Sequence, residues 1–424
     1  MDLWLFSHDG ARTALVADGL TLSYTQLAER ADQAARRLAA RGVGAGDRVA
    51  VLLPPGVEFA AVLHALPRLG AVLVPVNTRL SEAERRSVVE GAHVVDAPLT
   101  GEEADVALRD SADPDEPHSI IHTSGTTSRP KPVVLTYGNH VASAQSSATN
   151  LGVQPDDAWL GVLPLFHVGG LQVLIRSAIY GTTAVPHDGF DAERVKEVLE
   201  RGEVTLASFV ATMVRRLREV GLSRTPRLRA ALIGGGPVPG DLIDWAADIG
   251  LPLLPTYGMT ETASQIVTAP RPGDPARPLP GVELRTSEDG ELLVRGPMVS
   301  AGALSADGWL HTGDRGRLEP DGSVHVEGRI GDTIITGGEN VAAAEVEEAL
   351  LSHPAVRDAG VVGQDDPEWG QVVVAYVVAD GVSDDALLAH ARGRLAGYKL
   401  PKAIHRRREL PRNAAGKLLR RRLK

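Results

Sequence analysis

A run of small hydroxylated residues and glycine, closed by a lysine, is the segment of this chain best suited to hold phosphates. A strand-like stretch from Ser119 to His122 leads directly into Thr-Ser-Gly-Thr-Thr-Ser-Arg-Pro-Lys at residues 123 to 131. Hydroxyls and freed backbone amides donate hydrogen bonds to phosphate oxygens, and a lysine adds positive charge. The segment is not a Walker loop, because Pro130 precedes the lysine and Pro132 follows it. An exposed polar turn is the alternative, since the same residue types favour turns. The candidate phosphate-binding residues are Thr123, Ser124, Gly125, Thr126, Thr127 and Lys131.

Lysine is rare in this chain, which makes each lysine informative. The 44 basic residues comprise six lysines and 38 arginines. A flexible ammonium can follow one oxygen through a reaction as a point charge, which a planar guanidinium cannot do. Lys131 and Lys417 are therefore of special interest. Lys417 belongs to a basic cluster between Arg406 and Lys424, which is either a solvated tail or a surface that meets phosphates.

The composition indicates a large cytosolic protein with more than one domain. At 424 residues the chain exceeds the size at which a single core usually keeps growing. The formal net charge of −10 disfavours a nucleic acid as the main partner, because phosphate neutralisation dominates that affinity. Cysteine is absent, which excludes disulfides and thiolate metal sites. The N-terminus does not suit a signal peptide, and no apolar run reaches the roughly 18 residues of a membrane helix. We therefore expect a cytoplasmic location without membrane insertion.

Short β-rich runs alternate with helical patterns from about residue 20 to residue 260. This alternation predicts an α/β architecture with buried, largely parallel sheets. Between Gly281 and Glu327 the pattern changes to strands separated by Glu-Asp-Gly and Pro-Asp-Gly turns, which predicts a small β subdomain. A new α/β pattern follows, with a helix at 343 to 351 and a strand at 371 to 379. We place a domain boundary near Ile330, with an N-terminal domain over 1–329 and a C-terminal domain over 330–424.

Residues 123 to 131 resemble the signature of the adenylate-forming, or AMP-binding, superfamily, which includes acyl-CoA synthetases, non-ribosomal peptide adenylation domains and firefly luciferase. Further motifs match in the family's order, at Pro164 to Gly170, Ile233 to Pro237, Tyr257 to Thr262, Trp309 to Asp314, Gly328-Arg329 and Pro411 to Lys417. The resemblance implies a large α/β domain with a small β subdomain, followed by a small mobile α+β lid domain. It also implies an ATP-dependent, AMP-forming acid:CoA ligase that uses Mg²⁺ and coenzyme A. The chain departs from the family's usual residues at Ser128, Pro132, Gly331 and Ala342-Ala343.

The resemblance also assigns roles to the matching residues of the nucleotide site. Glu261 would hold Mg²⁺ by one carboxylate while phosphates complete the octahedron, and Thr260 would bond to a phosphate oxygen. Tyr257 would stack on adenine and Asp314 would accept bonds from the ribose hydroxyls. Arg329 would reach the same sugar or the α-phosphate. A capped helix start is the alternative explanation for the pair at 260 and 261.

The other matching motifs would serve the reacting groups and coenzyme A. Lys417 would contact both the substrate carboxylate and the nucleotide. His167 would border the acyl pocket, although a lone histidine is more often structural. The glycine run at 233 to 237 would let the backbone approach a flat ligand, and a tight turn is the alternative. The remaining cofactor-binding candidates are Gly235, Gly236, Gly337 and Gly338.

Within the superfamily, residues 257 to 268 and 164 to 181 look most like the 2-succinylbenzoate:CoA ligases of menaquinone biosynthesis. That substrate carries a second carboxylate, which a dry acyl pocket must answer with a cation or several donors. The candidates are Arg176, Ser264, Gln265 and Thr268. Gln172, Arg176 and Tyr180 share one helical face, so a solvated stripe is the alternative for Arg176. Another aryl- or acyl-CoA ligase and a catalytically silent nucleotide-binding module stay open as functions, and so does the formation of a homo-oligomer.

Overall fold

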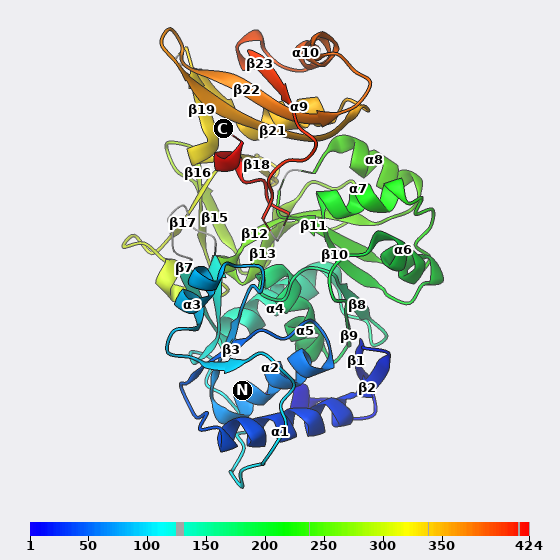
Figure 1. Cartoon of the computed structure of the whole chain (residues 1–424), viewed down its shortest axis with the longest axis vertical. Coiled ribbons are helices and arrows are strands. Elements are labelled where there is room, and N and C mark those ends of the chain that lie inside the picture. Colours follow the sequence, from blue (N-terminus) through cyan, green and yellow to red (C-terminus); the bar gives the residue numbers. More distant parts are fainter. Residues whose placement is uncertain (124–130, 237, 338, 414–415, 424) are drawn as a thin grey trace.

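The computed structural model of the chain describes residues 1–123, 131–236, 238–337, 339–413 and 416–423. In Figure 1 the molecule is elongated, with helix α1 (Tyr24–Ala40) at one end and the C-terminal sheet at the other. The large N-terminal part combines two mainly parallel sheets, an antiparallel sheet and the helices that cover them. This is the α/β architecture that the alternating pattern predicts.

The largest sheet has nine strands in the order β14-β13-β12-β11-β10-β8-β9-β1-β2. The strands from β1 to β12 along this order pair in parallel, and antiparallel strands close both edges. Their bounds are β1 Thr13–Ala17, β2 Leu20–Ser23, β8 Ala158–Gly161, β9 Thr183–Pro186, β10 Leu206–Val210, β11 Ala230–Gly234, β12 Leu253–Met259, β13 Ser264–Thr268 and β14 Arg277–Pro278. The sheet therefore brings the carboxyl ends of β11 and β12, which carry two of the motifs, side by side.

A second sheet of five strands has the order β5-β3-β4-β6-β7. Its bounds are β3 Arg48–Val51, β4 Val72–Pro75, β5 His93–Val95, β6 Pro117–Thr123 and β7 Lys131–Thr136. Strand β7 is antiparallel to β6, whereas the other pairs are parallel. The helices of the large domain are α1, α2 Val57–Leu69, α3 Glu82–Val89, α4 Tyr137–Leu151, α5 Val168–Tyr180, α6 Ala192–Arg201, α7 Ala211–Glu219 and α8 Gly240–Asp248.

Helices α4 and α5 lie in the middle of the large domain (Figure 1). Helix α4 contacts β7 of the smaller sheet and β13 of the larger one, and α5 contacts β8, β9 and α4. Ten of the residues of α5 are buried, including Gln172 and Arg176. A helix that is covered on all sides has no solvent-facing stripe. The polar face of α5 therefore lies in the interior of the large domain.

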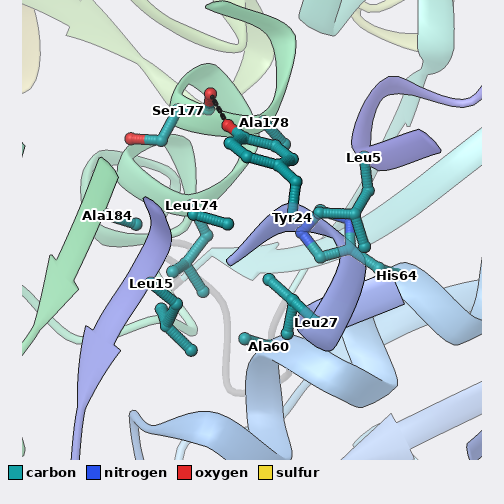
Figure 2. A pocket seen from close by; sticks show the side chains of 11 residues that line it. Leu5, Leu15, Tyr24, Leu27, Ala60, His64, Leu174, Ser177, Ala178 and Ala184 are labelled. Atoms are coloured by element: carbon teal, nitrogen blue, oxygen red, sulfur yellow. Dashed lines mark hydrogen bonds between the residues drawn. The ribbon is translucent and has the colours of Figure 1, made fainter. Parts of the chain in front are cut away.

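A small cavity lies against the opposite face of α5 (Figure 2). Leu174, Ser177 and Ala178 line it, and in a helix of 3.6 residues per turn Leu174 and Ala178 point away from Arg176. The Tyr24 hydroxyl donates hydrogen bonds to the carbonyls of Ser177 (2.9 Å) and Thr182 (2.8 Å) at its edge. The cavity leaves about 10 Å³, room for about one water molecule, so it is not a pocket for an acid substrate.

The small antiparallel sheet has the order β15-β16-β17-β18. Its bounds are β15 Glu283–Thr286, β16 Glu291–Arg295, β17 Leu310–Leu318 and β18 Val324–Arg329. The Glu-Asp-Gly and Pro-Asp-Gly turns connect its strands, and Gly290 and Gly322 both adopt φ +84° there. A positive φ is the conformation that glycine adopts without a steric penalty. The β subdomain is thus present where the turn residues predict it.

The C-terminal part has its own sheet and its own hydrophobic core. The strand order is β20-β19-β22-β21, and β23 pairs with β22. The bounds are β19 Thr333–Thr336, β20 Glu339–Ala342, β21 Val356–Asp366, β22 Gly370–Ala379, β23 Ala403–Arg406, α9 Ala343–Leu351 and α10 Asp384–Arg392. In Figure 1 the last segment, in red, descends from this sheet toward the large domain.

Ion pairs within the C-terminal part account for several arginines of the basic cluster. The pairs are Arg406–Asp384, Arg412–Asp358, Arg420–Asp332 and Arg420–Glu347. These three arginines are therefore not a solvated tail. The described residues include no helix that is both long and apolar enough to cross a membrane.

Candidate active site

The described ends of the hydroxyl-rich segment are held together by β6 and β7. Thr123 and Lys131 are antiparallel partners, and the Thr123 hydroxyl donates a 3.3 Å hydrogen bond to the Lys131 carbonyl. Pro132 pairs with His122 in the same ladder. Ser124, Gly125, Thr126 and Thr127, with Ser128, lie outside the described residues. The structure therefore fixes where the segment leaves the sheet and where it returns.

Three residues of the predicted nucleotide site meet on strands β12, β17 and β18. The Tyr257 hydroxyl donates to Asp314 Oδ2 at 2.8 Å, and Arg329 Nε lies 3.0 Å from Asp314 Oδ1. Arg329 also donates through Nη1 to the Thr312 carbonyl at 2.6 Å. Asp314 is buried, and burial raises its pKa although Arg329 and Tyr257 act in the opposite direction. Burial and the charge of Asp314 also raise the pKa of Tyr257, which keeps the hydroxyl a donor.

Lys417 lies beside this cluster although it belongs to the C-terminal part. Its backbone N–H donates to Asn413 Oδ1 at 2.8 Å, and the Asn413 N–H donates to the Lys417 carbonyl at 2.9 Å. A Cβ on the adjacent Gly416 would lie 3.3 Å from Val210 Cγ2, so the loop touches the large domain after β10. Desolvation by the surrounding protein and then the nearby Arg329 guanidinium lower the pKa of Lys417, although the residue keeps exposed surface.

Arg420 ties the Lys417 segment to the connection between the two parts of the chain. It contacts Asp332 at 2.8 Å and Glu347 at 2.6 Å. Burial raises the pKa of Glu347 to about 7, against the lowering effect of Arg420. Asp332 follows Gly331. Apart from the residues next to it in the chain, a Cβ added at Gly331 would have no other heavy atom within 4 Å. A side chain at Gly331, next to the predicted domain boundary, would therefore meet no steric obstacle at its Cβ.

The glycine run ends β11 next to β12. A Cβ on Gly234 would approach the Thr256 carbonyl oxygen to 3.0 Å, so this glycine serves close strand packing. Gly235 has φ +80°, which makes it the turn residue. Gly236 faces open space. The run is therefore a tight turn, and the approach of a ligand to its backbone stays a prediction.

Thr260 and Glu261 do not begin a long helix. Thr260–Thr262 forms a single 3₁₀ turn between the antiparallel strands β12 and β13. A Cβ on Gly258 would come within 2.0 Å of the Ser264 carbonyl oxygen, which explains the glycine that precedes the turn. Glu261 is half-buried, and its carbonyl accepts a 2.8 Å hydrogen bond from the Ser300 N–H. The pair therefore opens a short 3₁₀ turn and not an α-helix, and Glu261 lies on that turn.

The described residues include no group of three or more His, Asp or Glu side chains that could cage a metal ion. A single carboxylate such as Glu261 is nevertheless enough for Mg²⁺ when substrate phosphates and waters supply the other oxygens. The residues that are present therefore fit an ion that arrives together with a nucleotide.

Arg176 is buried, with 1 % of its surface exposed, and polar side chains from α4 and β13 contact its guanidinium. Its Nη2 donates to Ser143 Oγ at 2.9 Å, and its Nη1 donates to Gln265 Oε1 at 3.2 Å and Ser147 Oγ at 3.3 Å. Its Nε has no hydrogen-bond partner in the described part of the chain. Burial lowers the pKa of Arg176. The solvated-stripe alternative is wrong, because the arginine is an interior cation held by neutral groups.

The other predicted acyl-pocket residues differ in whether they contact Arg176. Gln265 contacts Arg176, whereas the Thr268 hydroxyl lies 2.9 Å from the Thr256 hydroxyl and not in the arginine's shell. Ser264 is half-buried at the start of β13. His167 immediately precedes α5, and its Nε2 is buried without a partner in the described part of the chain. Burial lowers the pKa of His167 to about 4, so this imidazole is neutral at physiological pH.

The second glycine motif lies on the turn between β19 and β20. Gly337 has φ +58°, and its N–H donates to the Trp369 carbonyl at 2.8 Å. A Cβ there would lie 2.8 Å from the Trp369 ring, and Lys402 Nζ is 5.4 Å from the centre of that ring. Gly338 lies outside the described residues. Sequence reasoning missed Trp369, Ser143 and Ser147, because isolated tryptophan and serine residues carry no spacing signal.

Comparison with known proteins places the chain among enzymes that use adenine nucleotides. The family model described as "AMP-binding enzyme" matches residues 6–95 and 92–304, and the one described as "AMP-binding enzyme C-terminal domain" matches residues 345–417. A 2-succinylbenzoate--CoA ligase of Bacillus cereus is 40 % identical over 458 residues, which covers 97 % of this chain and 95 % of that protein.

Solved structures agree with the family models. An o-succinylbenzoate CoA synthetase from Bacillus subtilis, in complex with the acyl-adenylate intermediate OSB-AMP, has a TM-score of 0.93 at 37 % identity and covers 100 % of this chain and 98 % of that one. The same B. subtilis enzyme in complex with ATP and magnesium ion gives a TM-score of 0.93 at 38 % identity, with 100 % and 99 % coverage. ATP-bound MatB from Rhodopseudomonas palustris has a TM-score of 0.89 at 28 % identity, with 100 % and 98 % coverage. Matches along nearly the whole chain, together with the assembled tyrosine, aspartate, arginine and lysine, show that this protein belongs to the AMP-binding enzyme family.

Proposed function

We propose that this chain is an ATP-dependent, AMP-forming 2-succinylbenzoate:CoA ligase of menaquinone biosynthesis. In the first half-reaction the acid's carboxylate oxygen attacks the α-phosphorus of ATP, the bond to the β,γ-diphosphate breaks, and pyrophosphate leaves. In the second, the coenzyme A sulfur attacks the acyl carbonyl and AMP leaves. No protein nucleophile takes part, so the protein contributes alignment and stabilisation of developing charge.

The observation that carries the choice of acid is the buried Arg176 with only neutral partners. An interior charge without an opposite charge is costly, whereas a guanidinium and a carboxylate that meet in a dry site form strong, directed hydrogen bonds. The Nε–H group of Arg176 is a donor that has no acceptor in the described part of the chain. A substrate that brings a second carboxylate satisfies it. Gln265 holds the guanidinium, Ser264 and Thr268 extend the lining on β13, and His167 borders the pocket as a neutral group.

The nucleotide half of the site follows from the cluster around Asp314. Tyr257 packs against adenine, Asp314 binds the ribose hydroxyls, and Gly235 and Gly236 give the base room to approach the backbone. Thr123, Ser124, Gly125, Thr126, Thr127 and Lys131 surround the phosphates, with Thr260. Glu261 would hold Mg²⁺, and the ion would neutralise phosphate charge when bound. Arg329 and Lys417 provide positive charge where the carboxylate meets the α-phosphate.

The chain divides between residues 329 and 330, and the C-terminal domain serves the two half-reactions in turn. The place of Lys417 near Asp314 and Arg329 supports a role for this lysine in adenylation. Rotation about Gly331 would withdraw Lys417 and bring Gly337 and Gly338 toward the acyl adenylate for coenzyme A. We propose a cytoplasmic location, where ATP and coenzyme A are both supplied.

Pyrophosphate exchange with a panel of carboxylic acids tests the proposal. Radiolabelled pyrophosphate should enter ATP in the presence of Mg²⁺ and 2-succinylbenzoate, and much less with benzoate, malonate or a fatty acid. Lys417→Ala should abolish most of the exchange, and Lys196→Ala is the matched control because Lys196 makes a surface ion pair with Glu200 on α6. Preference for another acid would make the chain a different acyl-CoA ligase, and absence of exchange with every acid would favour a silent nucleotide-binding module.

A further inference from the structure

Two adjacent residues at the metal-binding turn have strained backbones. Among the described residues, three non-glycine residues have positive φ, and two of them are Ala263 (φ +52°) and Ser264 (φ +128°). A left-handed conformation is unfavourable for alanine because its Cβ crowds the following carbonyl. Such strain persists only where the surroundings hold it in place, and it concentrates at functional sites. Ala263 is completely buried directly after Thr260–Thr262, so the strain sits beside Glu261.

Buried side chains from helices α4 and α5 hold this turn. The Ala263 carbonyl accepts a 2.8 Å hydrogen bond from Gln172 Nε2 on α5 and a 3.1 Å bond from Ser143 Oγ on α4. Gln172 is 2 % exposed, and Nε2 also donates to His140 Nδ1 at 2.8 Å. His140 Nε2 in turn lies 2.9 Å from Ser119 Oγ on β6, the strand that leads into the phosphate segment. The Gln172 amide is thus fixed at two acceptors.

We infer that Gln172 is a positioning residue for the Mg·ATP half of the site, which acts by holding Ala263 in its left-handed conformation and so aims Thr260 and Glu261 at the phosphates. The inference rests on the proposed function of Glu261. Gln172 does not touch the substrates itself. When its hydrogen bond is lost, the turn relaxes toward negative φ and the Glu261 carboxylate moves away from the phosphates.

Ser143 also links the turn to Arg176, on the acyl side of the site. Ser143 Oγ donates to the Ala263 carbonyl and accepts from Arg176 Nη2. Gln172 and Arg176 are four residues apart and lie on one face of α5. Ser143 therefore anchors both the arginine and the metal-binding turn.

The substitution Ala263→Gly separates positioning from mere packing. Glycine adopts positive φ without the Cβ penalty, so the turn of this variant keeps its shape with fewer restraining bonds. If Gln172 acts through Ala263, then Ala263→Gly compensates for the loss of the Gln172 amide. If Gln172 only fills space, the glycine has no such effect.

The experiment compares Gln172→Leu, Gln172→Glu, Ala263→Gly and the two double variants in the full chain. Gln172→Glu keeps the shape but replaces the two amide N–H donors with a carboxyl group, which has at most one O–H donor. Thermal unfolding establishes that each variant folds. Pyrophosphate exchange then gives kcat and the KM values for Mg·ATP and for 2-succinylbenzoate, and titration calorimetry gives Mg²⁺-dependent ATP binding without any acid. Val173→Ala is the control, because Val173 is the next residue of α5 and packs in a different cluster with Trp159 and Leu206.

Both Gln172 variants should raise the KM for Mg·ATP and lower kcat by roughly 10- to 100-fold, as small misplacements in active sites do. The KM for the acid should change less. Ala263→Gly should restore most of the loss in the double variants, whereas it should not improve Val173→Ala. Folded Gln172 variants with wild-type kinetics, or a loss that Ala263→Gly leaves untouched, would overturn the inference. A wild-type protein that exchanges no pyrophosphate would contradict the proposed function, while a calorimetric loss in Gln172→Leu that Ala263→Gly restores would still support the positioning role.

Discussion

The Tyr257 hydroxyl donates a 2.8 Å hydrogen bond to Asp314 Oδ2, across 57 residues of sequence and between two different sheets. Asp314 is held from its other oxygen by Arg329 at 3.0 Å. The carboxylate is thus fixed between a neutral donor on β12 and a cation on β18. Such a carboxylate is oriented before a ligand arrives, which reduces the ordering cost of binding.

Removing the tyrosine hydroxyl should loosen Asp314 without unfolding the protein. We expect Tyr257→Phe to raise the KM for ATP roughly tenfold, the value of one hydrogen bond to a charged group. The preference for ATP over 3′-deoxy-ATP should also fall, because a less well oriented Asp314 would form weaker hydrogen bonds with the ribose hydroxyls. Exchange kinetics with both nucleotides check this. An unchanged ratio between them would show that the Tyr257 hydroxyl does not orient Asp314 toward the ribose.

Glu261→Gln should retain the fold and severely lower adenylation, because an amide is a poorer Mg²⁺ ligand than a carboxylate. The Mg²⁺ concentration for half-maximal exchange should rise in the variant. Glu288→Gln, in the exposed turn between β15 and β16, is the matched control. Wild-type exchange in folded Glu261→Gln would remove the metal assignment.

Arg176→Met keeps much of the side-chain volume but removes the charge. We expect activity on 2-succinylbenzoate to fall about 100-fold or more, as when one partner of a buried charge pair is lost. Activity on 4-oxo-4-phenylbutanoate, which lacks the ring carboxylate, should change little. The measurement is kcat/KM for both acids. Equal losses on the two acids would leave Arg176 with a structural role alone.

Lys417 should serve only the first half-reaction. Lys417→Ala should lose roughly 10²-fold or more in adenylation, because a positioned cation on developing negative charge is worth several kcal/mol. Supplied with preformed acyl adenylate and coenzyme A, the same variant should form the thioester at nearly the wild-type rate. If both half-reactions fall by the same factor in folded protein, the alternation of the C-terminal domain is wrong.

The lowered pKa of Lys417 predicts an alkaline limit to adenylation. The ammonium form is the active one, so kcat/KM for ATP should fall as pH rises through the pKa of the free enzyme. Desolvation and Arg329 place that midpoint below the ordinary lysine value of about 10.4. Lys417→Arg should move the fall beyond the accessible range, because guanidinium does not deprotonate there. An identical pH profile in this variant would assign the fall to another group.

The sequence by itself determined the architecture and most of the chemistry. The α/β alternation, the turns at Gly290 and Gly322 and the helix from Ala343 to Leu351 were all readable, because periodicity and turn chemistry are local properties. The family's motifs likewise pointed to Tyr257 and Asp314. Motifs are recognised from residue types and their order along the chain, and neither requires knowledge of distances in the structure.

The tertiary structure decided which polar residues are interior and which ones meet. A helical face with Gln172 and Arg176 is the same pattern whether it faces water or a second sheet, and only the placement of α5 inside the large domain buries it. No local signal marks Ala263 as left-handed, because alanine rarely takes that conformation and the side chains that contact its carbonyl, such as Gln172, are distant in sequence. Long-range contacts, which single-sequence patterns do not encode, therefore set the state of the arginine and the strain of the turn.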